Sequence, residues 1–204
     1  MTGSEVLEPL TAACLHTLEQ WVPGDPSQER LRADYVGWAE SHPNAWSRAC
    51  IPAHLTASAL VCNADGSRVV LVRHAKVGLW LQTGGHLEAD DRSLEDAALR
   101  EATEETGLCG LTLLPQPTQL SRHRVSCVAE WHLDVQFTIV AGREVPPPGS
   151  VESTGIGWFD ADDLPEPTDD AVRDLVEASA RRLRRDPIQS TFAGSLPRSD
   201  QPSR

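Results

Sequence analysis

Four charged residues at close spacing could do chemistry together: Arg100, Glu101, Glu104 and Glu105. On a helix, residues three and four positions apart share a face, with roughly 5–6 Å between their Cβ atoms. The three carboxylates would therefore converge, and Arg100 could neutralise part of their charge. Clustered oxygen ligands suit a hard divalent cation such as Mg²⁺. A solvated surface helix can carry the same charged residues without binding a metal. The segment before the helix therefore has to distinguish a metal site from a solvated helix face.

That preceding segment favours a binding site, because Gly84-Gly85 lets the backbone approach a ligand or metal closely. The helix that follows is well delimited. Ser93 is a suitable N-cap, and Gly107 is suitable for the left-handed residue that ends a helix. We therefore predict a helix over residues 94–106, with the side chains of Glu104 and Glu105 facing solvent.

Residues 84–108 resemble the Nudix box, G-x5-E-x7-R-E-U-x-E-E-x-G-U, in which U is a bulky aliphatic residue. The matching residues are Gly85, Arg100, Glu101, Glu104, Glu105, Gly107 and Leu108. Two features depart from the pattern. The interval from Gly85 to Arg100 is one residue longer, and Asp91 or Asp90 replaces the loop glutamate. A shorter acid in a longer loop can recover the same contact.

The resemblance implies an α/β fold, a Nudix-type α/β/α sandwich with a mixed curled sheet. It also implies hydrolysis of a nucleoside diphosphate linked to another moiety, by attack of water on phosphorus, with Mg²⁺ or Mn²⁺ as cofactor. Glu101, Glu104 and Glu105 would hold the metal together with the carbonyl of Gly85, and Arg100 would orient the glutamates. The alternative is a catalytically weak, nucleotide-binding or regulatory domain of the same fold.

The catalytic base is open between Glu101 and a second acid, Glu130. Residues 130–138 alternate between polar and apolar side chains, which indicates a strand with one face in the core. The polar row consists of Glu130, His132, Asp134, Gln136 and Thr138. This row either meets water or lines the substrate cleft, in which case His132 and Asp134 would contact substrate. The competing interpretation is that His132 and Asp134 only hydrogen-bond to each other.

Two basic clusters flank the expected cleft of an otherwise acidic chain. Arg73, His74 and Lys76 precede the glycine pair, and Arg122 follows the next strand. We assign these residues to substrate phosphate, although ordinary surface charge is the competing interpretation. His86, beside the glycine pair, is interpreted as structural.

The remaining pattern predicts the elements that position these residues. We expect strands over residues 54–62, 68–74, 80–82, 110–120, 130–141 and 156–159, and a last helix over residues 169–185. Apolar spacing in residues 5–21 indicates an N-terminal helix. A second helix would begin at Pro26, with Asp25 as its cap and Gln28 closing that cap. Together these two helices form a helical hairpin.

The length and net charge of the chain limit its domain organisation and the partners that it can bind. The chain has 204 residues, and 18 basic against 30 acidic residues give a net charge of −12. We expect an N-terminal helical extension (residues 1–50), a hydrolase domain (51–186) and a polar, disordered tail (187–204). So acidic a chain lacks the basic footprint that nucleic acid or an anionic membrane requires. We expect a cytoplasmic protein with no secretory signal, whose cysteines are free and mostly buried. Its substrate would be a small molecule, and it could form a homodimer.

Overall fold

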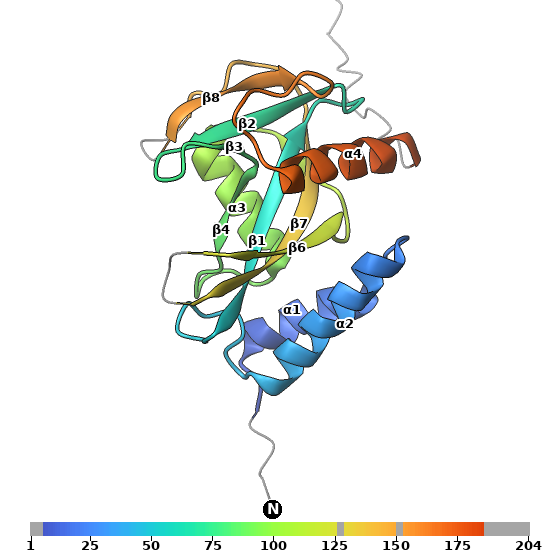
Figure 1. Cartoon of the computed structure of the whole chain (residues 1–204), viewed down its shortest axis with the longest axis vertical. Helices are drawn as coiled ribbons and strands as arrows, with labels where there is room; N and C mark the ends of the chain where they lie inside the picture. Colours follow the sequence, from blue (N-terminus) through green and yellow to red (C-terminus); the bar gives the residue numbers. More distant parts are fainter. Residues whose placement is uncertain (1–5, 126–128, 150–152, 186–204) are drawn as a thin grey trace, which may run out of the picture.

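The computed structural model describes residues 6–125, 129–149 and 153–185. A mixed, eight-stranded sheet runs through the molecule (Figure 1). Its strands are β1 (Ala53–Cys62), β2 (Arg68–His74), β3 (Trp80–Leu81), β4 (Thr83–His86), β5 (Leu111–Leu113), β6 (Gln119–Arg124), β7 (Trp131–Ala141) and β8 (Ser153–Asp160). Strand β1 is central, parallel to β7 and antiparallel to β2 and β4. Strands β5 and β6 add to β7, and β3 and β8 add to β2.

Alternation along β1 assigns the helices to opposite faces of the sheet. Leu55 and Ala57 belong to the same apolar cluster as the buried residues of α3 (Leu94–Thr106). Leu60 belongs to the cluster that contains the buried residues of α4 (Asp170–Arg185). Because successive strand residues point to opposite faces, α3 and α4 cover opposite sides of the sheet. This is the predicted α/β/α sandwich.

Helices α1 (Pro9–Gln20) and α2 (Pro26–Ser41) form the predicted N-terminal hairpin, beside the end of the sheet where β1 begins (Figure 1). Asp25 caps α2 by accepting the backbone N–H of Ser27 at 2.6 Å, as predicted. The hairpin packs on the same side of the sheet as α3, and the Thr17 hydroxyl donates to Glu95 of α3 at 3.2 Å.

The prediction for Gln28 holds for its backbone, whose N–H donates to Asp25 Oδ1 at 3.3 Å, but not for its side chain. Its side chain leaves the cap and reaches strand β6, where Nε2 donates to the carbonyl of Leu120 at 3.2 Å. Its Oε1 accepts the Leu120 backbone N–H at 2.7 Å. The Leu120 backbone offers the Gln28 side-chain amide both a donor and an acceptor, which the cap of α2 does not. These two hydrogen bonds fasten the hairpin to the sheet.

The single strand predicted over residues 110–120 is two strands, β5 and β6, that pair with different parts of β7. Pro115 and Pro117 interrupt it, because proline has no N–H for the ladder, and Gln116 between them has φ of 69°. The other predicted strands and both remaining helices are present within a few residues of their expected bounds.

No helix in the described part of the chain is long and apolar enough to cross a membrane. Among the described cysteines, Cys14, Cys50 and Cys62 are buried and Cys109 is exposed, and all four are free. Cys127, the start of the chain at residues 1–5 and the predicted tail from residue 187 lie outside the described residues.

Candidate functional site

Helix α3 begins and ends where the sequence predicts, which fixes the face that carries its charged residues. The Ser93 side chain caps it by accepting the Asp96 N–H at 3.2 Å, and Gly107 ends it at φ of 67°. Buried alanines and Leu94 hold the helix on the sheet. Arg100, Glu101 and Glu105 lie next to this packed stripe and reach strand β4.

Arg100 is the centre of the charged network. It donates through Nε and Nη2 to both carboxylate oxygens of Asp91, at 3.0 and 2.9 Å. Its Nη1 donates to Glu101 at 2.9 Å and to Glu104 at 3.3 Å. Nη2 also donates to the backbone carbonyl of His86 at 3.0 Å. One guanidinium thereby ties the helix, the loop and the end of β4 together, and it positions two of the glutamates as predicted.

The loop acid is Asp91, and Asp90 is exposed. The Asp91 side chain is only 5 % exposed and also accepts the Glu88 backbone N–H at 2.8 Å. Hydrogen bonding to Asp91 raises the pKa of Arg100, which keeps the guanidinium charged. The extra loop residue therefore allows a shorter acid to reach the arginine.

The glycine pair brings the backbone of β4 against the carboxylates. The Gly84 N–H donates to Glu105 Oε1 at 2.9 Å. A Cβ atom on Gly85 would lie 2.5 Å from Glu101 Oε1, so only glycine fits there without displacing that carboxylate. Gly84 is equally restricted, because its Cβ would lie 2.2 Å from the Cβ of Ser58.

The three glutamates of α3 differ in exposure. Glu104 is 60 % exposed, as predicted, but Glu105 is only partly exposed because it turns toward β4 to accept the Gly84 N–H. Burial raises the pKa of Glu101, and the charge of Glu104 adds to that rise while Arg100 opposes it. Within the described residues, the three glutamates do not form a group whose oxygens all lie within 4.8 Å of one another.

These residues fit a hard divalent cation by their chemistry. All the side-chain atoms that could bind the cation are carboxylate oxygens. The backbone of Gly85, which has no side chain, lies directly against the carboxylate of Glu101. Mg²⁺ prefers oxygen ligands of this kind. The glutamates are held by N–H donors from Arg100 and Gly84, which a cation would partly replace.

Asp134, Gln136 and Thr138 of the polar row are buried, His132 is partly buried and Glu130 is exposed, so most of the row neither meets water nor lines an open cleft. Asp134 is 3 % exposed and Gln136 is 1 % exposed. Asp134 accepts hydrogen bonds from Thr56 at 2.9 Å, Ser58 at 2.7 Å and Gln136 at 2.9 Å. Polar residues of the neighbouring strand β1 satisfy this carboxylate, so polar side chains form an internal layer there.

Two other predicted site residues near β7, Glu130 and Arg122, form ion pairs with residues outside α3. Glu130 lies just before β7, half exposed, and forms an ion pair with Arg124 of β6. Arg122 forms an ion pair with Asp34 of α2 at 3.7 Å. The structure therefore places Glu130 and Arg122 on the β6–β7 side of the molecule, and neither is brought to the glutamates of α3 by a described contact.

Arg73, His74 and Lys76 are exposed at the end of β2 and in the turn that follows. Their described polar contacts are local. The Lys76 N–H donates to His74 Nδ1 at 3.2 Å, and the Arg73 carbonyl accepts from the Thr154 hydroxyl at 3.2 Å. Their role toward a substrate stays a prediction.

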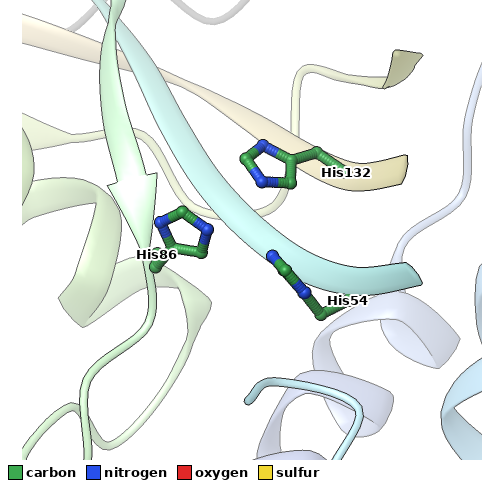
Figure 2. A group of neighbouring side chains, drawn as sticks. All are labelled: His54, His86 and His132. Carbon is green, nitrogen blue, oxygen red and sulfur yellow. The ribbon is translucent and has the colours of Figure 1, made fainter. Parts of the chain in front are cut away.

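A cluster of three histidines, His54, His86 and His132, was missed as a unit. One nitrogen of each ring can be chosen so that all three nitrogens lie within 4.8 Å of one another. Figure 2 shows the three rings pointing into a common space. Ring centroids are 4.7–5.0 Å apart. From the sequence, His86 is expected to be structural and His132 to contact substrate, and His54 is not among the candidates. No local pattern reveals that β1, β4 and β7 meet at these positions.

Burial keeps these histidines uncharged at neutral pH. It lowers the pKa of His86 to about 4 and that of His132 to about 3, and it also lowers the pKa of His54. The nearby cation Arg48 and the neighbouring rings act in the same direction. A neutral imidazole has one protonated ring nitrogen and one that carries a lone pair.

Comparison with known proteins identifies the matching part of the chain. The family model described as "NUDIX domain" matches residues 52–179, which begins after the helical hairpin. A Nudix-family hydrolase from Clostridium perfringens is 23 % identical, covers 64 % of this chain and 96 % of its own, and has a TM-score of 0.53.

Two further solved structures share the fold. The dihydroneopterin triphosphate pyrophosphohydrolase of E. coli is 17 % identical, with 64 % of this chain and 96 % of its own covered and a TM-score of 0.53. The MutT protein of Methanosarcina mazei Go1 is 21 % identical, with coverage of 65 % and 96 % and a TM-score of 0.52. At these identities the similarity concerns the fold.

Proposed function

Because the chain belongs to the Nudix family, we propose that it is a metal-dependent pyrophosphohydrolase that cleaves a nucleoside diphosphate linked to another moiety. The observation that carries this proposal is the network of Arg100 on α3. One guanidinium pairs with the loop acid Asp91 and with two of the glutamates, opposite a backbone made accessible by glycine. A surface helix with no ligand has no need of this arrangement.

The residues that would hold Mg²⁺ or Mn²⁺ are Glu101, Glu104, Glu105 and the backbone carbonyl of Gly85. When bound, a divalent cation supplies neutralisation of diphosphate charge and a lowered pKa for a coordinated water. It also explains how a chain with a net charge of −12 binds a polyanion.

The chain's own residues position the reaction and accept its proton. Arg100 holds Glu101 and Glu104 in place, and the Gly84 N–H holds Glu105. Glu101 is our first candidate for the base that takes the proton of the attacking water. Its pKa is raised toward neutral pH, which makes its carboxylate a better proton acceptor. Glu130 remains the second candidate and is paired with Arg124.

We assign substrate contacts to Arg73, His74, Lys76, Arg122, His132 and Asp134, as the sequence predicts. Arg73, His74 and Lys76 suit phosphate by charge and exposure. Asp134 would act from inside the polar layer by holding Thr56 and Ser58. We also propose a cytoplasmic enzyme for a small molecule, with neither nucleic acid nor membrane as partner. A homodimer stays a prediction.

The test is phosphate release, coupled to alkaline phosphatase, with Mg²⁺ or Mn²⁺ and a panel of nucleotide sugars, dinucleotides and nucleoside triphosphates. Glu105→Gln is the diagnostic variant. Glu177→Gln is its matched control, since Glu177 is an exposed helical glutamate of α4 paired with Arg181. We expect turnover on one substrate class in the wild type and in Glu177→Gln, and its loss in Glu105→Gln.

Turnover that persists in Glu105→Gln would overturn the assigned role of the glutamates. No turnover on any member of the panel, with nucleotide binding intact, would instead support the binding or regulatory domain that the sequence left as the alternative.

A further inference from the structure

We propose that His54, His86 and His132 form a second metal site, for a divalent transition ion of the zinc class. Its ligands are imidazoles and not the carboxylates of α3, and the proposal does not depend on the function proposed above. It makes His132, assigned there to substrate, a ligand of the metal ion. It rests on the register of three strands, on two buried ring nitrogens without partners and on the chemistry of the donors.

Strand register brings the three rings together on one face. His54 of β1 is directly opposite His132 of β7 in the parallel pair. His86 of β4 is opposite Thr56, two residues after His54 and therefore on the same face of β1. The side chains thus come from three adjacent strands of the sheet.

Two of the ring nitrogens are buried and unsatisfied. Nε2 of His54 and Nε2 of His86 have no hydrogen-bond partner, and His54 is fully buried. Buried polar atoms of this kind are rare, because leaving one unpaired costs about 1–3 kcal/mol. Simple packing of the rings explains their proximity but leaves both nitrogens unpaired. A metal ion would satisfy them together.

The tautomer of His54 suits metal binding. Its Nδ1 lies 3.3 Å from the carbonyl of Cys50, which can only accept, so Nδ1 carries the proton in this contact. Nε2 then keeps its lone pair. A histidine that binds a metal characteristically donates its other ring N–H to a carbonyl or carboxylate in this way.

The donor set selects the class of ion. Three neutral imidazoles favour Zn²⁺ and similar transition ions over Mg²⁺, which prefers oxygen. Zinc binds imidazole nitrogen at about 2.0–2.1 Å, so tetrahedral ligands lie roughly 3.3–3.4 Å apart. The nitrogens, now within 4.8 Å, need only small ring movements to reach that spacing.

Three protein ligands leave one position of a tetrahedral ion for a further ligand. His123 of β6 is directly opposite His132, with ring centroids 5.5 Å apart, and is exposed. The positive charge of Arg48, which contributes to the lowered pKa values of all three histidines, would repel a dication, but Arg48 is exposed and its charge is screened by water. Its charge favours water, hydroxide or a phosphate oxygen at that fourth position.

The test measures Zn²⁺ binding by calorimetry, with excess Mg²⁺ present to occupy carboxylate sites, on the full chain. We expect one tight site in the wild type and a loss of affinity of about 100-fold or more in His86→Gln and His132→Gln. His16→Gln, an exposed histidine of α1, and Glu105→Gln are the matched controls and should bind as the wild type does. Equal affinity in the wild type and His132→Gln would overturn the site.

A measurement on the wild type alone guards against a variant that fails to fold. X-ray absorption of the zinc-loaded protein should show three imidazole ligands at about 2.0–2.1 Å. Co²⁺ in its place should give the visible absorption of a tetrahedral ion. Spectra dominated by oxygen ligands, or no binding of either ion, would refute the proposal.

Discussion

The carboxylates of α3 and the histidines of β1, β4 and β7 are two candidate metal-binding regions built on opposite principles. The glutamates are charged and are held by Arg100 and by the Gly84 N–H. The histidines are uncharged, and the Nε2 atoms of His54 and His86 have no hydrogen-bond partner. Like charges must be neutralised before they can converge, whereas neutral ligands need only be buried on facing strands.

Loss of a single carboxylate should have the largest effect, and only on the α3 region. We expect Glu105→Gln to lower turnover about 100- to 1,000-fold, because electrostatic stabilisation by a held cation contributes several kcal/mol. Zinc affinity should not change. Steady-state kinetics and calorimetry on the same preparation measure both. Parallel losses of turnover and zinc binding would show that the two regions are one site.

Zinc should stabilise the protein through the histidines alone. At a free concentration 100 times Kd, a ligand adds about 2.7 kcal/mol to the free energy of unfolding. We expect this rise in the wild type and in Glu105→Gln, and its absence in His132→Gln. Thermal denaturation with and without Zn²⁺ gives the comparison, and a chelator should reverse the rise.

The pair of Arg100 and Asp91 should contribute to folding as well as to positioning. Asp91→Ala leaves the arginine without its main partner, and we expect the free energy of unfolding to fall by about 2 kcal/mol, since Arg100 keeps some contact with water. Asp90→Ala, an exposed neighbour in the same loop, should change it by less than about 0.5 kcal/mol. Urea denaturation separates the two variants, and similar losses would contradict the assignment of Asp91.

A methyl group at Gly85 should produce the smallest of these effects. In Gly85→Ala the new Cβ would displace the Glu101 carboxylate, which lies 2.5 Å away at the end of a flexible side chain. We expect Mg²⁺ affinity to fall about tenfold with little change in stability. Gly24→Ala is the control, since nothing lies within 4 Å of its Cβ. Unchanged Mg²⁺ affinity in Gly85→Ala would remove Glu101 from the cation site.

The same contrast explains how much the sequence could predict. The charged helix and its loop are local features. Ser93 and Gly107 delimit the helix by chemistry within one turn, so its bounds of Leu94–Thr106 were correct. The pairing of Arg100 with the glutamates of the helix was also predictable, whereas its pairing with Asp91 of the loop, and the choice of Asp91 over Asp90, come from the structure.

Features that depend on strand pairing could not be predicted in this way. His54 joins His132 only because β1 and β7 pair in parallel at that register. Asp134 is buried only because Thr56 and Ser58 of β1 satisfy it. Alternation along one strand predicts two faces, but it does not say what covers each face.

The contact of Gln28 with Leu120 has a consequence for the sheet as a whole. In the described part of the chain, β6 pairs with β7 alone, so its outer edge would present unpaired backbone groups. The amide of Gln28 offers one donor and one acceptor to that edge, as a residue of a neighbouring strand would. Open edges invite pairing between molecules and aggregation. The N-terminal hairpin therefore occupies part of the edge at which another chain could add a strand.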